Sequence, residues 1–208
     1  MRFQTFILCV SVLSIVPACV QADTVLLNEK FDELSPFLGV TSAGAFHTIG
    51  GTNVDIVGPG DGFPLCFAPE SGNCIDMDGS GGNPQGILQT VNSFTLLPGA
   101  KYFLSFDLIG SGRGLTTSTT VDFGPYSQTF ILASGDVSSG IVSNALVTVG
   151  TTTITNLTFT SNTPGNIGTV LDNVLITSGA SSVPEPSSML LMGTALLGLG
   201  LLVRKPLA

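Results

Sequence analysis

The residues of this chain that could do chemistry are few, and their spacing favours structural roles. The 208 residues include one histidine, His47, and no tryptophan. A hydrolase needs a nucleophile beside a base, or two carboxylates about 5–10 Å apart. Asp76, Asp78 and Asp107 could supply such a pair, but Asp76 and Asp78 alternate beside a glycine run, which is typical of a strand running into a turn. We therefore expect a protein that is not an enzyme.

The N-terminus has the three parts of a secretory signal peptide. A basic start at Arg2 precedes the apolar run 6–16, which ends at Pro17, and short side chains follow up to Ala22. We expect residues 1–22 to form a signal helix that directs the chain to the Sec machinery and is removed by signal peptidase after Ala22. An alternative is lipoprotein processing before Cys19, because residues 16–19 loosely follow a lipoprotein box.

The cysteines can be assigned once export is accepted. Cys9 and Cys19 lie in the segment that is expected to be removed, so the mature chain keeps only Cys66 and Cys74. Exported chains enter an oxidising compartment, where an isolated pair eight residues apart is most simply a disulfide. A metal site would need more ligands than these two thiols and His47. The sequence therefore predicts a Cys66–Cys74 disulfide.

The C-terminus has the composition of a membrane-spanning tail. A small-residue linker at 178–183 leads to Pro184, Glu185 and Pro186, and the run 187–203 that follows contains no charge. Seventeen helical residues extend about 26 Å, which is just enough for a thin bilayer. Arg204 and Lys205 close the run, so the positive-inside rule places the tail end in the cytoplasm and the rest of the chain outside.

This tail, from Pro184 to the end at 208, resembles the PEP-CTERM sorting signal of Gram-negative bacteria. The matching parts are Pro184-Glu185-Pro186, the apolar span 187–203 and the basic pair Arg204-Lys205. The resemblance implies recognition by an exosortase, cleavage near the motif, inner-membrane anchoring in transit, and delivery to the cell surface or the extracellular matrix of a biofilm. The alternative is a permanent single-span anchor.

Charge excludes one class of partner. The chain has a formal net charge of −8, and residues 23–183 keep three basic and 13 acidic residues, for a net charge of −10. A nucleic-acid binder neutralises phosphates with lysine and arginine, so this class is excluded. The same charge weighs against direct adhesion to an anionic matrix.

The region between the two targeting segments is organised as strands. In 101–108, Tyr102, Leu104, Phe106 and Leu108 share one face, and Pro98-Gly99 before them signals a turn. Helical periodicity is absent from this region, and short strands with turns between them are typical of an all-β sandwich or jelly roll. We expect a β-sandwich domain at 23–177. Its strands are predicted at 24–28, 54–57, 74–77, 86–96, 101–108, 119–123, 126–132, 141–149, 153–160 and 170–176.

Several short stretches of this region together resemble galactose-binding-like jelly rolls, including the choice-of-anchor proteins. The similar stretches are 28–32 (NEKFD), 54–58 (VDIVG), 74–79 (CIDMDG), 86–90 (GILQT), 98–102 (PGAKY), 104–108 (LSFDL) and 171–174 (LDNV). The chain departs from these proteins in having no tryptophan and in having Asp32 where glutamate is usual. The resemblance implies a structural calcium ion that ties the first strand to the last, and the matching positions are Asp32 and Asp172. A second, weaker calcium candidate is Asp76-x-Asp78-Gly79, with solvated carboxylates as the alternative.

Sugar binding usually combines an aromatic platform with polar groups that pair with hydroxyls. Tyr102 is predicted to face the core, so Tyr126, after a Gly124-Pro125 turn, is the better ligand candidate; a locally packed tyrosine is the alternative. We expect an exported surface or matrix protein that associates with a neutral exopolysaccharide or cell-wall glycan. The alternatives are a purely structural envelope protein and, less favoured, a carbohydrate-active enzyme.

Overall fold

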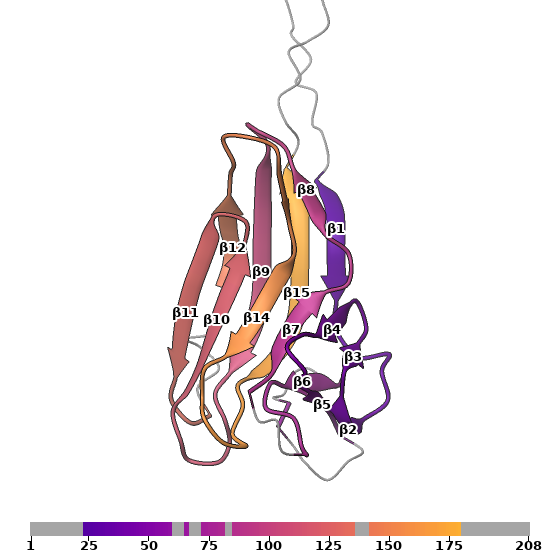
Figure 1. Cartoon of the computed structure of the whole chain (residues 1–208), viewed down its shortest axis with the longest axis vertical. Coiled ribbons are helices and arrows are strands. Elements are labelled where there is room, and N and C mark those ends of the chain that lie inside the picture. Colours follow the sequence, from indigo (N-terminus) through magenta and orange to yellow (C-terminus); the bar gives the residue numbers. More distant parts are fainter. Residues whose placement is uncertain (1–22, 60–64, 67–71, 82–84, 136–141, 180–208) are drawn as a thin grey trace, which may run out of the picture.

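The alternating sequence of the exported region forms strands throughout. The computed structural model describes residues 23–59, 65–66, 72–81, 85–135 and 142–179, and every regular element in these segments is a β-strand. These strands form two layers (Figure 1). In the same segments there is no helix that could cross a membrane. The predicted signal helix at 1–22 and the predicted membrane span at 187–203 lie outside the described residues.

The larger sheet has seven strands, all paired antiparallel. Its strands are β1 (Thr24–Glu29), β2 (Phe37–Val40), β5 (Val54–Val57), β6 (Cys74–Asp76), β9 (Lys101–Ile109), β12 (Val142–Val147) and β15 (Val170–Gly179). The order is β12-β9-β15-β6-β5-β2, and β1 also pairs with β15. Glu29 pairs with Val174, whereas β6 pairs with Val170 and Leu171, so β1 and β6 lie end to end along one edge of β15.

The second sheet has six strands in the order β11-β10-β14-β7-β4-β3. Their bounds are β3 (Ser42–Ala43), β4 (Phe46–Thr48), β7 (Ile87–Thr90), β10 (Thr117–Phe123), β11 (Tyr126–Leu132) and β14 (Leu157–Ser161). A separate two-stranded ribbon pairs β8 (Phe94–Leu96) with β13 (Thr153–Thr155). The predicted runs 86–96 and 153–160 therefore each divide into two strands that belong to different sheets.

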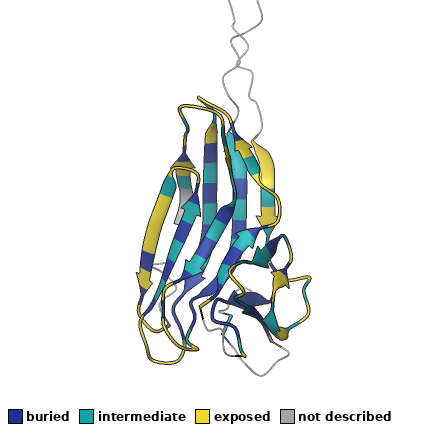
Figure 2. Ribbon diagram, in the orientation of Figure 1, coloured by how far each residue is buried: buried dark blue, intermediate teal, exposed yellow. Residues whose placement is uncertain are grey.

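The two sheets bury one apolar core between them. The alternating residues of β9 (Tyr102, Leu104, Phe106 and Leu108) are all buried, as their spacing predicts, and Figure 2 shows the same alternation along the strands. Phe106 of the larger sheet meets Phe130 and Phe159 of the smaller one, with ring centroids 5.6 and 5.2 Å apart. These edge-to-face contacts join the layers. The predicted all-β sandwich is confirmed.

Candidate functional site

The outer face of the six-stranded sheet is a polar surface. Across its strands the register aligns one row of outward residues, which runs His47, Gln89, Thr158, Asp122, Ser127. The amide of Gln89 donates to the Thr158 hydroxyl at 3.2 Å. Asp122 is the one carboxylate in this row, so hydroxyl and amide groups dominate the surface.

A second outward row lies beside the first and is also linked by hydrogen bonds. Thr160 pairs with Ile87 on one side and Thr120 on the other. The hydroxyls of Thr120 and Thr129 lie 2.8 Å apart, and the amide of Asn162 donates to Thr120 Oγ1 at 2.8 Å. These bonds hold the polar groups in fixed positions on the sheet.

At its Thr160 end this polar surface is hollowed. An open hollow of about 480 Å³ is lined by Gly50, Gly51, Thr52, Gln85, Ile87, Thr160, Ser161 and Asn162. Thr52 fixes one wall, because its hydroxyl donates to the Ile49 carbonyl at 2.8 Å and accepts from the Ile87 N–H at 3.1 Å. The N–H of Ser161 donates to the Gly86 carbonyl at 2.9 Å, which fixes the opposite wall.

The lining determines which ligand chemistry the hollow suits. Hydroxyl and amide side chains both donate and accept hydrogen bonds, and Ile87 adds an apolar patch. None of the described residues that line the hollow is charged or aromatic. Such a surface can bind a neutral molecule that carries many hydroxyls.

A second polar group, the carboxylates of Asp55, Asp76 and Asp78, is buried next to the hollow, where Asp78 lies against Ser161. Asp55 is a structural acceptor: its Oδ1 accepts from the N–H groups of Gly39 at 2.6 Å and Ser80 at 2.8 Å. Its Oδ2 accepts from the Ser80 hydroxyl at 2.7 Å. Asp55 therefore attaches the edge strand β2 and the turn after β6 to the larger sheet.

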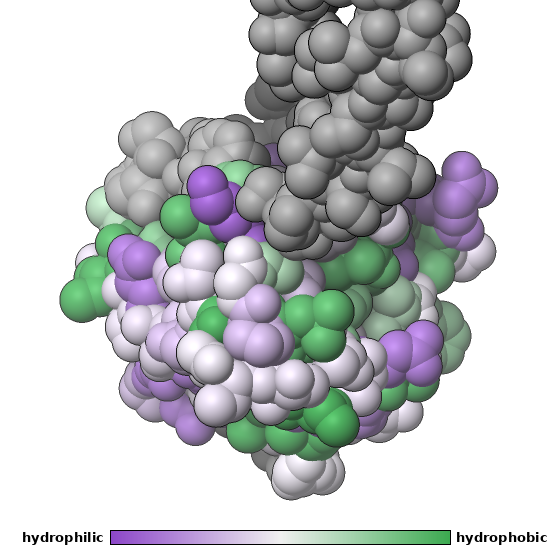
Figure 3. All heavy atoms as spheres, turned by 90° about the horizontal axis from the view of Figure 1, so that it is seen from above, coloured by the Kyte–Doolittle hydropathy of each residue, from purple (hydrophilic) through white to green (hydrophobic). Residues whose placement is uncertain are grey.

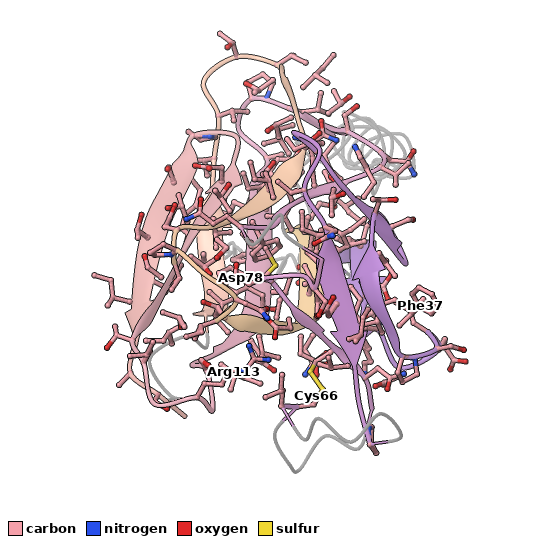
Figure 4. All side chains as sticks on the ribbon, turned by 60° about the horizontal axis from the view of Figure 1, so that its bottom comes forward. Phe37, Cys66, Asp78 and Arg113 are labelled. Atoms are coloured by element: carbon pink, nitrogen blue, oxygen red, sulfur yellow. A yellow bond between two sulfur atoms is a disulfide. The ribbon has the colours of Figure 1, made fainter. Side chains whose placement is uncertain are left out.

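Asp76 has a cationic side chain near its carboxylate, whereas Asp78 accepts a hydrogen bond from a backbone N–H. Arg113 Nη2 lies 3.9 Å from Asp76 Oδ2, and the same guanidinium also donates to the Asn166 carbonyl. Asp78 Oδ2 accepts from the Ile167 N–H at 3.2 Å. Figure 4 shows Asp78 inside the body of the domain and Arg113 at its lower end.

Burial determines how these two carboxyls titrate. Burial raises the pKa of Asp76 to about 6, against a backbone hydrogen bond from Asp78 and the charge of Arg113. Burial also raises the pKa of Asp78 to about 6, although hydrogen bonds involving Ser161, Ile167 and Gly86 oppose the shift. Both groups are therefore poised to change protonation in mildly acidic solution.

The two residues predicted as calcium ligands have different surroundings. Asp172 is buried on β15, and its Oδ1 accepts from the Asn173 N–H at 2.7 Å. Asp32 is exposed after β1, and its side chain lies against the backbone of Gly72. In the part of the chain that the structure describes, no group of three or more His, Cys, Asp or Glu side chains lies together as a metal site would need. Calcium binding stays a prediction, and the effect of EDTA on the unfolding temperature would test it.

The other predicted site residues divide between the described and undescribed parts. The Cys66–Cys74 disulfide is confirmed, with Cα atoms 5.8 Å apart. Tyr126 lies away from the hollow: it is half-buried against the core, and its hydroxyl donates to Gln128 Oε1 at 3.0 Å. The sorting residues Pro184, Glu185, Pro186, Arg204 and Lys205 lie outside the described residues.

The hollow itself was not predicted. Its walls come from three segments, around 50–52, 85–87 and 160–162, which pairing between β7 and β14 and the turn after β4 bring together. None of these segments has a motif. The one available signal was the run of polar residues at alternate positions in 158–162, which predicts a solvent-facing strand side but not a hollow.

Comparison with known proteins identifies the tail. Residues 182–205 match the family described as the PEP-CTERM protein-sorting motif, which confirms the sorting signal predicted there. The motif indicates an exported protein that passes through the membrane and is sorted to the cell surface. No match was found among curated protein sequences.

Several solved structures are similar to the domain. The CBM22-1–GH10 modules of a Clostridium thermocellum endo-1,4-β-D-xylanase, complexed with xylohexaose, are 15% identical with a TM-score of 0.44. That match covers 78% of this chain and 30% of the xylanase chain. A cleaved adhesin domain of Lys-gingipain from Porphyromonas gingivalis is 19% identical, covering 76% and 100%, with a TM-score of 0.42. The CBM22-1 xylan-binding domain of Paenibacillus barcinonensis Xyn10C is 16% identical, covering 76% and 96%, with a TM-score of 0.39.

Proposed function

We propose that this chain is an exosortase-sorted surface protein that holds a neutral glycan, without catalysis, in the hollow beside Thr160. The observation that supports the proposal is an open hollow of about 480 Å³ lined by hydroxyl and amide groups in a domain that is exported. Such groups can exchange hydrogen bonds with water for equivalent bonds with sugar hydroxyls.

Charge supports a neutral ligand. The exported region 23–183 has a net charge of −10, which repels anionic polysaccharides in solution. The hollow lacks a cationic side chain among its described lining residues, so it offers no compensation for a uronic acid or a sulfate. We therefore assign it to neutral exopolysaccharide or cell-wall glycan.

The test compares two threonines on the same sheet face. Thr160→Val removes a hydroxyl in the hollow at nearly constant volume, and Thr129→Val does the same two strands away. Residues 23–183 are incubated with insoluble cellulose, xylan and mannan, and the bound fraction is measured over a concentration series. We expect at least one polymer to retain the wild type, and Thr160→Val to weaken its retention about fivefold, the equivalent of about 1 kcal/mol. Thr129 is connected to the hollow only through Thr120 and Asn162, so Thr129→Val should weaken retention much less than Thr160→Val.

A purely structural role is the second candidate, and the lining residues give a reason for it. Carbohydrate sites usually have an aromatic platform, and none of the described lining residues is aromatic. Failure of all the polymers to retain the folded wild type would reject the glycan proposal and favour scaffolding. Retention that both threonine variants leave unchanged would place the glycan elsewhere on the domain. Release of reducing sugar from a retained polymer would contradict the non-catalytic part of the proposal.

A further inference from the structure

The outer face of the larger sheet has a row of apolar residues near its upper end. Leu146 on β12 pairs with Phe103 on β9, Phe103 pairs with Thr177 on β15, and Thr177 pairs with Val25 on β1. Directly paired residues point to the same side of a sheet. Leu146 is 54% exposed and Val25 58% exposed, while Phe103 and Thr177 are half-buried.

Two neighbours enlarge this row. A register shift between Val25 and Leu27 leaves Leu26 exposed beside it. Leu175, two residues from Thr177 on the same face of β15, is half-exposed. We call Val25, Leu26, Phe103, Leu146 and Leu175 the apolar row. On the outer face of the other sheet, the exposed Ile131 of β11 follows the polar Ser127 and Thr129 along the strand.

The row lies where the chain leaves the sandwich toward its tail. Lys101 pairs with Gly179, the last described residue. The ring of Phe103 packs against Gly179, because a Cβ added to Gly179 would lie 3.0 Å from Phe103 Cε2. Seven residues, 180–186, separate Gly179 from the uncharged run 187–203. Even fully extended, this connection reaches only about 30 Å. While the run is in a bilayer, Gly179 therefore stays within about 30 Å of the membrane, so the apolar row beside it can reach the lipid head groups.

Charge distribution favours the same face. Lys101, one of three cations in residues 23–183, is exposed at the rim of the row, at the same end of the sheet as Asp23, which precedes β1. The nearest carboxylate on the same face of β9 is Asp107, about 13 Å along the strand from Phe103. The buried carboxylates of Asp76 and Asp78 lie at the other end of β9, about 30 Å from Lys101. In the view from above, hydrophilic side chains are scattered singly among pale and apolar ones (Figure 3).

We propose that the apolar row is a membrane-docking surface, occupied by the lipid bilayer while the tail is inserted. The larger sheet then faces the membrane and the polar surface with its hollow faces away from it. A few aliphatic side chains bind a bilayer weakly by themselves, but a short tether raises their effective concentration at the lipid surface into the millimolar range. Removal of the span would remove the tether and release the domain. This inference rests on insertion of the tail and not on glycan binding.

The absence of tryptophan makes a direct test possible. Leu146→Trp places a single fluorescent probe in the row, and Ile131→Trp places one at an outward position of β11 that is 69% exposed. The full chain is reconstituted into vesicles of phosphatidylcholine and phosphatidylglycerol, with and without brominated acyl chains. We expect emission from the Leu146→Trp probe to move to shorter wavelength and to be quenched by brominated lipid. The Ile131→Trp variant has the same tail and the same affinity of tryptophan for membrane interfaces. Its emission maximum should nevertheless stay at the wavelength typical of a solvent-exposed tryptophan.

A third variant separates docking from a general effect of the probe. Val25→Asp in the Leu146→Trp background should move the emission back toward longer wavelength and reduce the quenching, because it places a charge in the row. Unfolding temperatures measured by circular dichroism establish that each variant is folded. Equal quenching of the Leu146→Trp and Ile131→Trp probes would overturn the proposal. So would a shift that appears without lipid and grows with protein concentration, because a second copy of the chain would then occupy the row.

Discussion

At the scale of single residues, Gly168 shows how tightly the buried carboxylates are packed. A Cβ at this position would collide with Asp76 Oδ1 and would lie 2.5 Å from the Asp78 nitrogen and 3.0 Å from the Met77 nitrogen. Two of these atoms belong to the backbone and cannot move independently. We expect Gly168→Ala to lower the free energy of unfolding by about 1–3 kcal/mol, measured by urea denaturation.

Gly150 provides the matched control for this substitution. It lies in an exposed turn, and a Cβ there would meet no atom within 4 Å. Gly150→Ala should change the free energy of unfolding by less than about 0.5 kcal/mol, with stabilisation as the expected sign because alanine restricts the unfolded chain. Equal effects of the two substitutions would contradict the close packing around Asp76.

Titration of Asp76 and Asp78 should make stability depend on pH. Burial raises the pKa of each carboxyl from 3.8 to about 6, so the folded state binds more protons than the unfolded state between these values. The associated stability is present below pH 4 and is lost as the pH rises through 6. We expect the two groups together to lower the free energy of unfolding by about 2–4 kcal/mol between pH 4.5 and 7.5.

Isosteric amides isolate this effect from the titration of other carboxylates. Asp76→Asn and Asp78→Asn each remove one titrating group, and the double variant removes both. Chemical denaturation at intervals of pH should show the decline between pH 4.5 and 7.5 becoming shallower in each single variant and shallowest in the double variant. An unchanged slope in all three would show that these carboxyls do not titrate in that interval.

At the scale of elements, the disulfide attaches a loop to the start of β6. Cys74 begins this three-residue strand, and Cys66 Sγ lies 3.3 Å from the Val57 carbonyl oxygen. A disulfide between cysteines eight positions apart removes conformational freedom from the unfolded chain. Replacing both cysteines by serine should lower the free energy of unfolding by about 2–3 kcal/mol, measured by thermal denaturation. A stability equal to that of the wild type under non-reducing conditions would contradict this role.

Strands could be predicted wherever every second side chain faces the core. β9, β10, β11 and β15 alternate clearly, and their predicted bounds agree with the structure to within a few residues. β2, β3 and β4 were not predicted, because each has at most four residues and Gly39 and Gly44 interrupt the pattern. Periodicity also does not show which sheet a strand joins, so the runs 86–96 and 153–160 were each predicted as one strand.

The candidate site was less predictable than the fold. The disulfide followed from elimination, because only two cysteines remain after export. The hollow depends on long-range pairing between segments without a motif, such as Thr160 with Ile87. The raised pKa values of Asp76 and Asp78 depend on burial, which the alternating Asp-x-Asp sequence does not reveal.

At the scale of the whole molecule, the described domain has two different outer faces. The polar hollow lies on the six-stranded sheet, with the buried Asp78 against its Ser161, and the apolar row lies on the outer face of the larger sheet. Asp23 and Gly179 lie at the same end of the sandwich, since Thr24 pairs with Ser178 (Figure 1). A membrane-inserted tail would therefore leave the hollow accessible to a glycan.

The fate of the tail decides whether this arrangement is permanent. Residues 182–205 match the PEP-CTERM protein-sorting motif, so we expect an exosortase to cut near Pro184-Glu185-Pro186. An epitope appended after Ala208 should be absent from the surface form of the protein, whereas an epitope inserted after Ala22 should remain, as immunoblots of fractionated cells would show. Glu185→Gln should cause the doubly tagged form to accumulate in the inner membrane. Full retention of the C-terminal epitope on the surface form would identify the tail as a permanent anchor, and the apolar row would then stay at the membrane throughout the life of the protein.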